Sequence, residues 1–255
     1  FADIDKNTVD FVDNYDGSMK EPALLPTTFP NILANPNLGI AVGMASSICS
    51  FNLAELCEAT AKYIKDDTID LVEHLSAPDF STGGQLIYNR KELEQIYKTG
   101  RGSVKLRAKY QYDKKDNCIE VTEIPYTTNI EAIIDKIIAL VKAGKIKDIT
   151  DVRDESDLNG LKITIDLKRG TNVDLLMHKL YAMTPLADNF SCNFNVLIHG
   201  IPMVLGVGDI LKHWTDFRMD SIRRQISFDI QKKTEKYHLL EGLAKILADI
   251  DKAIK

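Results

Sequence analysis

The stretch Val104-Lys105-Leu106-Arg107-Ala108-Lys109 decides the fold, because apolar and basic side chains alternate along it. An alternation of period two is typical of a strand that buries one face and exposes the other. A second strand is expected over residues 118–124, after the polar turn at 113–117. The sequence thus predicts two successive strands, and it places the cations of the first strand together on one exposed face.

A helix is predicted to follow the two strands. Apolar residues recur at helical spacing from Ile130 to Val141, and Gly144 ends the run. Thr128 and Glu131 have the spacing of a capping box, in which two side chains bond free N–H groups at the start of a helix. We therefore expect the helix to begin just after Thr128.

A second pair of strands and a second helix complete this unit. A short strand is expected at 149–153, and residues 161–168 alternate between apolar and polar side chains. Asn172 then caps a helix from about Val173 to Met183. The order strand-strand-helix-strand-strand-helix predicts a sheet with helices on one face, which is a two-layer α/β sandwich of the α+β class.

The chain before residue 100 is predicted to be irregular and then helical. Residues 1–37 are rich in Asp, Asn, Pro and Gly, and their recurring prolines exclude a long helix. We expect an extended segment that wraps on another part of the protein. Asn52 begins a helix that runs to about Ile64, and Asn89 begins one that Gly100 ends.

The end of the chain has the pattern of one long helix. After a strand at 193–198 and a turn at Gly200-Ile201-Pro202, no proline occurs from Asp209 onward, which allows a helix of roughly 70 Å. Apolar side chains recur along it at spacings of three and four, as in a coiled coil. They are Ile222, Ile226, Ile230, Tyr237, Leu240, Leu243, Leu247, Ile250 and Ile254. This seam is predicted to need a partner helix.

The composition is that of a globular chain with unevenly placed charge. Of the 255 residues 44% are hydrophobic, and the formal net charge of −5 is unusual for a protein that binds nucleic acid. Residues 98–115, however, hold seven basic side chains and one acidic one. Local patches decide binding, because salt screens charges beyond about 10 Å. We recognise no membrane span, no signal peptide and no metal-site spacing among the four cysteines.

Small and apolar residues gather in Gly39-Ile40-Ala41-Val42-Gly43-Met44-Ala45. Such a segment can be a tightly packed strand, and the residues alone favour a buried Ile40, since isoleucine is usually buried. It can also present an apolar wedge on a backbone that approaches another molecule closely, because glycine has no side chain to interfere.

Four motifs in a fixed order resemble those of a known family. They are the run from Asp5 to Gly17, the segment 39–45, Thr99-Gly100-Arg101-Gly102-Ser103 and Arg153-Asp154-Glu155-Ser156-Asp157. Together they closely resemble the A subunit of bacterial type IIA DNA topoisomerases, which are DNA gyrase and topoisomerase IV. Asn35–Leu38 and Ser46–Phe51 depart from the usual gyrase pattern. These departures favour topoisomerase IV slightly.

The resemblance implies a DNA-bending role for Ile40. The matching isoleucine of the family inserts between base pairs and kinks the duplex, and Gly39 and Gly43 would let the backbone come close to DNA. Further candidate DNA contacts come from the basic stretch, which has no acidic residue between Lys98 and Gln111 and whose spacing suits a phosphate backbone. They are Arg101, Lys105, Arg107 and Lys109.

The resemblance also implies what this chain leaves to other parts of the enzyme. The nucleophilic tyrosine of the family lies upstream of Phe1, so we expect no catalytic residue and no DNA cleavage by this chain alone. No cofactor or metal is expected here, since ATP and Mg²⁺ belong to the partner B subunit. The implied partners are double-stranded DNA, a second copy of the A subunit, and the B subunit of an A2B2 enzyme. The resemblance further implies that the protein is cytoplasmic and associated with the nucleoid, and that it does not bind a membrane.

Three regions are expected along the chain. Residues 1–100 would be the end of the DNA-gate region and the start of the tower, including the wedge. Residues 101–190 would be the α+β sandwich of the tower. Residues 191–255 would be a connecting strand and the first long helix of the coiled-coil arm.

Two other kinds of function are considered. A protein-interaction module that acts through the coiled coil, without DNA contact, stays open and is favoured by the pI of 5.6. Nucleotide binding is rejected, because neither 82–84 nor 100–103 has the Gly-Lys-Ser/Thr ending of a phosphate loop. The acidic residues around Arg153 are expected to form a salt-bridged turn rather than a metal site. They are Asp151, Asp154, Glu155 and Asp157.

Overall fold

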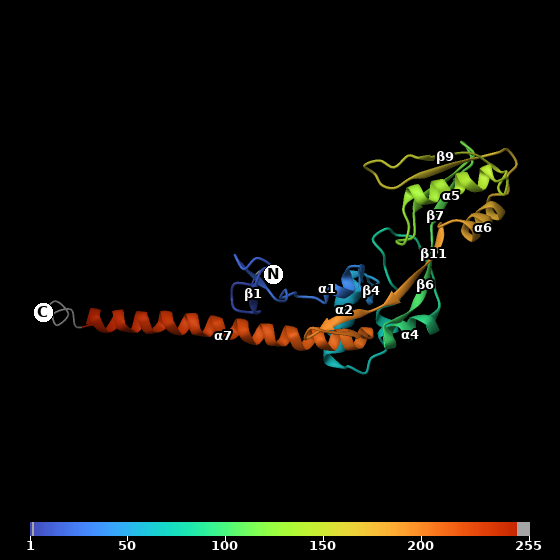
Figure 1. The fold of residues 1–255 in the computed structure, drawn as a ribbon. Helices are drawn as coiled ribbons and strands as arrows, with labels where there is room; N and C mark the ends of the chain where they lie inside the picture. Colours follow the sequence, from blue (N-terminus) through green and yellow to red (C-terminus); the bar gives the residue numbers. More distant parts are fainter. Residues whose placement is uncertain (2, 249–255) are drawn as a thin grey trace. The chain divides into compact units, whose positions relative to one another are not determined.

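The structure is a computed structural model that describes Phe1 and residues 3–248 (Figure 1). The chain divides into two compact units, of which one is Asn31–Ile210 and the other joins Phe1–Pro30 to the chain from Leu211 onward. None of the described helices is both long and apolar enough to cross a membrane. The three regions expected from the sequence, with boundaries at 100 and 190, stay a prediction.

The larger unit contains the predicted sandwich. Its antiparallel sheet has the strand order β7-β8-β10-β9, and two helices share a buried core with it (Figure 1). The elements are β7 Lys109–Asp113, β8 Cys118–Glu123, α5 Ile130–Lys142, β9 Ile149–Asp154, β10 Ile163–Leu167 and α6 Val173–Met183. Ile119 and Ile165 of the sheet bury their side chains with Ile137 of α5 and Met177 of α6. The predicted α+β class is confirmed, and so are the elements expected after the first strand.

The strand predicted over residues 104–109 is not continuous. It breaks at the buried Ala108, whose N–H donates to the carbonyl of Leu186 at 2.7 Å and whose carbonyl accepts from the Tyr181 hydroxyl at 2.8 Å. The residues before the break form β6 (Arg101–Arg107), which belongs to a different sheet from β7. Bonds to distant residues therefore redirect the chain from one sheet to the other.

The second antiparallel sheet of this unit has the strand order β3-β4-β11-β6-β5. Its strands besides β6 are β3 Asn37–Ala41, β4 Met44–Ile48, β5 Gln85–Ile87 and β11 Ala187–Asn193. A hairpin of β12 (Asn195–Ile198) and β13 (Ile201–Val204) follows β11. Besides α5 and α6, four further helices belong to the same unit, α1 Asn31–Ala34, α2 Leu53–Lys65, α3 Leu71–His74 and α4 Arg90–Thr99.

The helix caps largely follow the sequence signals. Asn52, Asn89 and Asn172 cap α2, α4 and α6 as predicted. Gly100 ends α4 with a φ of 67°, a left-handed conformation that favours glycine. The expected cap of α5 is wrong, because Asn129 rather than Thr128 accepts the bond from the N–H of Ala132, at 2.8 Å.

The turn expected at Gly200-Ile201-Pro202 is also shifted. His199 and Gly200 have positive φ values of 50° and 80° and connect β12 to β13, and Ile201 and Pro202 are already part of β13. Proline is tolerated there because this two-stranded hairpin leaves an edge without ladder bonds.

In the smaller unit the irregular N-terminal segment lies against the long helix α7 (Val207–Ala248). Its strands β1 (Phe11–Asp13) and β2 (Lys20–Pro22) pair with each other. Trp214 donates to Thr27 at 3.1 Å, and Arg224 donates to the carbonyl of Asn7 at 2.7 Å and pairs with Asp10 at 3.0 Å. The expectation that the segment wraps on another part of the protein is confirmed.

The long C-terminal helix is confirmed as far as Ala248. The predicted seam residues Ile226, Ile230 and Leu243 are exposed. Ile250 and Ile254 lie outside the described residues. The partner helix of the seam stays a prediction.

Candidate nucleic-acid interface

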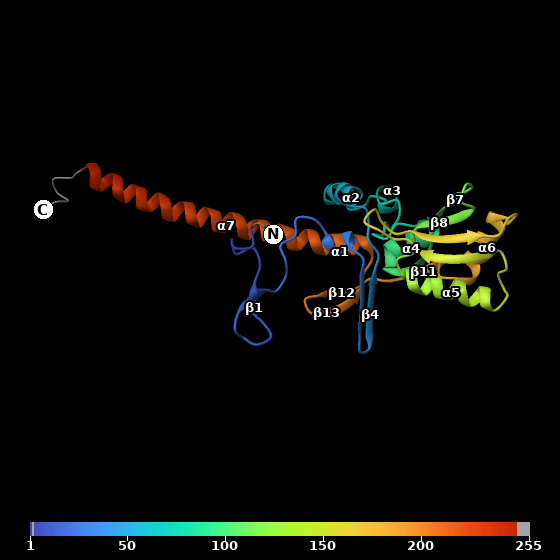
Figure 2. The ribbon, with the colours of Figure 1, turned by 90° about the horizontal axis from the view of Figure 1, so that it is seen from above.

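Ile40 lies near the tip of the β3–β4 hairpin, which projects from the second sheet (Figure 2). The strands are joined by Val42 and Gly43, and Gly43 has a φ of +80°, which explains the glycine. Ile40 is 96% exposed and Val42 is fully exposed. The interpretation of Ile40 as a buried core residue, which the residues alone favoured, is therefore wrong. The hairpin presents the isoleucine to solvent.

Among the described residues, no close neighbour requires a glycine at position 39. A Cβ built there would lie 4.0 Å from the Cβ of Ser46, which is ordinary contact. The role expected for Gly39 and Gly43, a close approach of the backbone to DNA, stays a prediction.

Polar side chains attach the hairpin to β11 and β12. Ser47 donates to the carbonyl of Ser191 at 2.6 Å, and Ser46 donates to the carbonyl of Asn195 at 2.8 Å. The side-chain amide of Asn193 donates to the carbonyl of Ala45 at 2.7 Å. Sequence reasoning missed these residues, because single serines and asparagines about 150 positions apart have no recognisable spacing.

Arg101 and Lys105 project from the exposed face of β6. In the register of the sheet, Arg101 is opposite Asn193 and Lys105 is opposite Asn189. Neither cation has an acidic partner within 4.0 Å among the described residues. The fold thus brings Arg101 beside the strand that anchors the Ile40 hairpin, and both cations are available to an anion.

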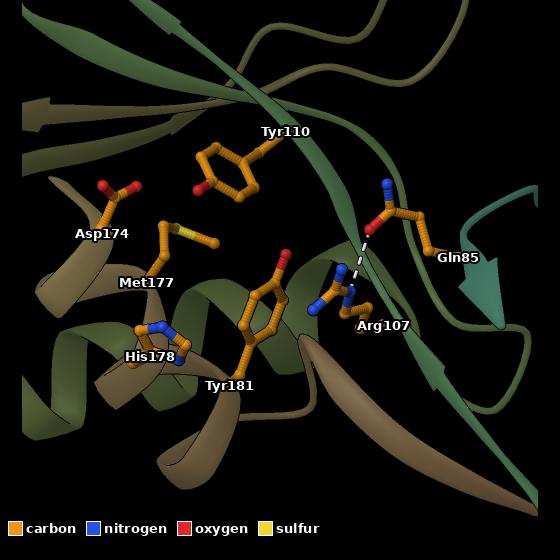
Figure 3. Close-up of a pocket in the computed structure, with 7 residues that line it drawn as sticks. All are labelled: Gln85, Arg107, Tyr110, Asp174, Met177, His178 and Tyr181. Atoms are coloured by element: carbon orange, nitrogen blue, oxygen red, sulfur yellow. Dashed lines mark hydrogen bonds between the residues drawn. The ribbon is translucent and has the colours of Figure 1, made fainter. Parts of the chain in front are cut away.

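Arg107 shares that face of β6 but is held by neighbouring side chains. Its Nε donates to Gln85 at 2.9 Å, and its guanidinium lies 5.7 Å from the ring centre of Tyr181 (Figure 3). Together with Tyr110, these side chains and residues of α6 line a pocket of about 300 Å³. Burial raises the pKa of Tyr181, and the nearby Arg107 cation opposes that shift. The Arg107 side chain is therefore oriented towards α6.

Lys109 does not share the sheet face of the other three cations, so the single basic face predicted from the sequence is wrong in this respect. It belongs to β7 and pairs with Glu123 at 2.9 Å. Glu123 also accepts from the N–H of Gly84 at 2.7 Å, and the bond from Lys109 is the main cause that lowers its pKa. A DNA contact by Lys109 stays a prediction.

Of the four acidic residues expected to form salt bridges near Arg153, Asp151 and Glu155 do so, whereas Asp154 and Asp157 accept hydrogen bonds from Ser156 and Asn159. Arg153 contacts Asp151 at 3.0 Å, Glu155 at 3.1 Å and also Asp166. Hydrogen bonds from Thr164 and Arg153 lower the pKa of Glu155. Within residues 3–248 no group of three or more His, Cys, Asp and Glu side chains has the arrangement of a metal site.

Comparison with known proteins connects this geometry to a family. Residues 1–255 match the family model that describes the A subunits of DNA gyrase and topoisomerase IV. The chain is 42% identical to the DNA gyrase A subunit of Ureaplasma parvum over 99% of its length and 31% of that relative. It is 42% identical to the DNA gyrase A subunit of Borreliella burgdorferi, over 99% of the chain and 32% of that relative. It is 41% identical to the DNA gyrase A subunit of Streptomyces coelicolor, over 99% of the chain and 30% of that relative. The chain thus spans about a third of these relatives, and it belongs to the family of DNA gyrase and topoisomerase IV A subunits.

Proposed function

We propose that this chain grips and bends the DNA duplex in a type II topoisomerase, with Ile40 inserted between base pairs. The observation that carries the proposal is the 96% exposure of Ile40 at the end of a hairpin, in a chain of this family. An apolar wedge offsets the loss of base stacking, which costs a few kcal/mol per step. Bending a duplex by 40–90° costs on the order of 1–6 kcal/mol in addition.

Phosphate contacts by Arg101 and Lys105 would supply part of that free energy. Both side chains are exposed on β6, and neither is neutralised by a described acidic neighbour. Arg107 and Lys109 would contribute less, because Gln85 and Glu123 already hold them.

The whole enzyme would cut both strands of one duplex, pass another duplex through and reseal the break. The nucleophilic tyrosine would come from another segment, since in the family it follows an arginine and none of the nine tyrosines here does. By the resemblance to the family, we assign Mg²⁺ and ATP to a B subunit in an A2B2 assembly. Such an enzyme acts in the cytoplasm, on the DNA of the nucleoid.

The parent enzyme is better described as a gyrase than as a topoisomerase IV. The three relatives compared with this chain are named as A subunits of DNA gyrase, so the sequence preference for topoisomerase IV has no support from them. ATP-dependent negative supercoiling by the reconstituted enzyme is the expected result. Decatenation without supercoiling would contradict the gyrase assignment.

Replacing Ile40 by alanine in a complete A subunit carrying this segment tests the proposal. With the B subunit present, Ile40→Ala is expected to reduce DNA bending and cleavage much more than affinity. Bending is measured by energy transfer between dyes at the two ends of a short duplex. Leu158→Ala is a matched control, because Leu158 is a fully exposed apolar residue in a turn between β9 and β10 of the sandwich. Equal bending by wild type and Ile40→Ala would overturn the proposal.

A protein-interaction module remains the second candidate function. The exposed apolar side chains along α7, such as Ile226 and Ile230, favour it. The salt dependence of DNA binding separates the two candidates. A gate-DNA interface predicts a steep loss of affinity with salt, and Arg101→Ala should lower that slope by about one. An interaction module predicts no salt-dependent DNA binding.

A further inference from the structure

The β3–β4 hairpin has little backbone attachment to the rest of its sheet. Pairing between β4 and β11 is confined to Ser47 and Asn193. Beyond that pair, a groove of about 260 Å³ lies between the hairpin and β12. A two-stranded ribbon without further support is at best marginally stable. Something else must keep the hairpin straight when its tip pushes into a base stack.

Side-chain hydrogen bonds continue the attachment where the backbone ladder ends. The amide of Asn193 donates to the carbonyl of Ala45 at 2.7 Å, and the amide of Asn195 approaches the same oxygen at 3.4 Å. Ala45 is the residue opposite Ile40 in the hairpin register. The strongest of these bonds therefore acts on the backbone directly across from the wedge.

We infer that Asn193 is a positioning residue for DNA bending, which holds the β3–β4 hairpin at the angle from which Ile40 enters the duplex. This inference rests on the proposed function. Asn193 is half-buried and belongs to β11, whose Phe190 is in the core, so the anchor is on a rigid strand. Its loss leaves every DNA-contacting side chain in place and frees the hairpin to tilt away from the stack.

The test uses a complete A subunit carrying this segment, assembled with a B subunit. Asn193→Ala is expected to lower the ratio of bent to straight duplex about fivefold, the effect of one hydrogen bond. The dissociation constant for DNA should change less than about twofold, because phosphate contacts dominate affinity. Asn189→Ala is the matched control, since Asn189 is an exposed asparagine of the same strand. It should bend DNA like the wild type.

A double mutant separates positioning from general damage to the fold. If Asn193 acts through Ile40, Asn193→Ala causes no further loss of bending in the Ile40→Ala background. Ser46→Ala, which removes only the bond to the carbonyl of Asn195, should reduce bending in the same direction and covers the case in which Asn193→Ala fails to fold. Normal bending by a folded Asn193→Ala or Ser46→Ala enzyme, or an equal loss with and without Ile40, would overturn the inference. Normal bending by Ile40→Ala would instead overturn the proposed function itself.

Discussion

The four-stranded sandwich and the β3–β4 hairpin use isoleucine in opposite ways. In the sandwich, Ile119, Ile137 and Ile165 are fully buried between the sheet and its helices. In the hairpin, Ile40 is 96% exposed, and side-chain hydrogen bonds attach the strands to β11 and β12. Burying such a side chain is worth about 1.5–3 kcal/mol, and the hairpin forgoes that stabilisation. An apolar residue that folding leaves exposed on an anchored support is a candidate contact for another molecule.

The largest expected effect concerns the stability of the sandwich. Ile137→Ala removes a fully buried side chain and should lower the free energy of unfolding by about 2–5 kcal/mol. Ile40→Ala should change it by less than about 0.5 kcal/mol, because an exposed side chain makes few contacts. Urea denaturation of both variants measures the difference. Similar losses in the two variants would contradict the contrast between the two regions.

Two of the left-handed glycines, Gly43 in the hairpin and Gly100 at the end of α4, allow a similar comparison of an open and a packed position. At Gly100 an added Cβ would lie 2.2 Å from the carbonyl oxygen of Leu205, whereas at Gly43 nothing lies within 4 Å. Gly100→Ala should therefore lower the free energy of unfolding by more than about 2 kcal/mol, from overpacking as well as strain. Gly43→Ala meets only the conformational strain, about 1–2 kcal/mol.

Thermal denaturation of the Gly100→Ala and Gly43→Ala proteins checks this order. If Gly43→Ala lowered the stability as much as Gly100→Ala, the hairpin tip would be packed against other residues rather than open to solvent.

The smallest effect is a pH dependence within the sandwich. The pKa of Glu123 is lowered in the folded protein, chiefly by its bond with Lys109. Its ionised form therefore stabilises the fold above the unfolded pKa of about 4.3, and this stabilisation is lost as pH falls through the folded pKa. Because both side chains are partly exposed to solvent, the contribution should be below about 1 kcal/mol.

Comparison of wild type and Glu123→Gln measures that contribution. The two proteins should differ in stability at pH 7 and converge in strong acid. A difference that persists unchanged at low pH would show that the carboxylate charge is not its cause.

The sequence could predict the sandwich because the relevant signals are local. The alternation in 161–168 and the helical spacing from Ile130 to Val141 each lie within a single element. The caps Asn52 and Asn172 were correct for the same reason, since a cap bonds an N–H only two or three residues away. The predicted cap of α5, Thr128, was one residue too early, because the spacing of the residues alone does not distinguish Thr128 from Asn129.

The candidate site was less accessible from the sequence, because its geometry depends on contacts between distant residues. The alternation of apolar and basic residues through 104–109 does not show whether Lys109 and Lys105 belong to the same sheet. They belong to different sheets, because the bonds of Ala108 to Leu186 and Tyr181 end the strand before Lys109. The alternation likewise predicted that Arg107 lies on the exposed face, but its contacts with Gln85 and Tyr181 are formed only in the folded structure.

By itself, then, the sequence determined the elements of the sandwich other than β7, the long helix and the motifs that indicate the family. Only the tertiary structure decided that Ile40 is exposed and that Asn193, 148 residues further along the chain than Ala45, bonds the backbone opposite it. The physical reason is that secondary structure follows from interactions within a few residues. Burial and anchoring depend on which distant strands the folded chain brings together.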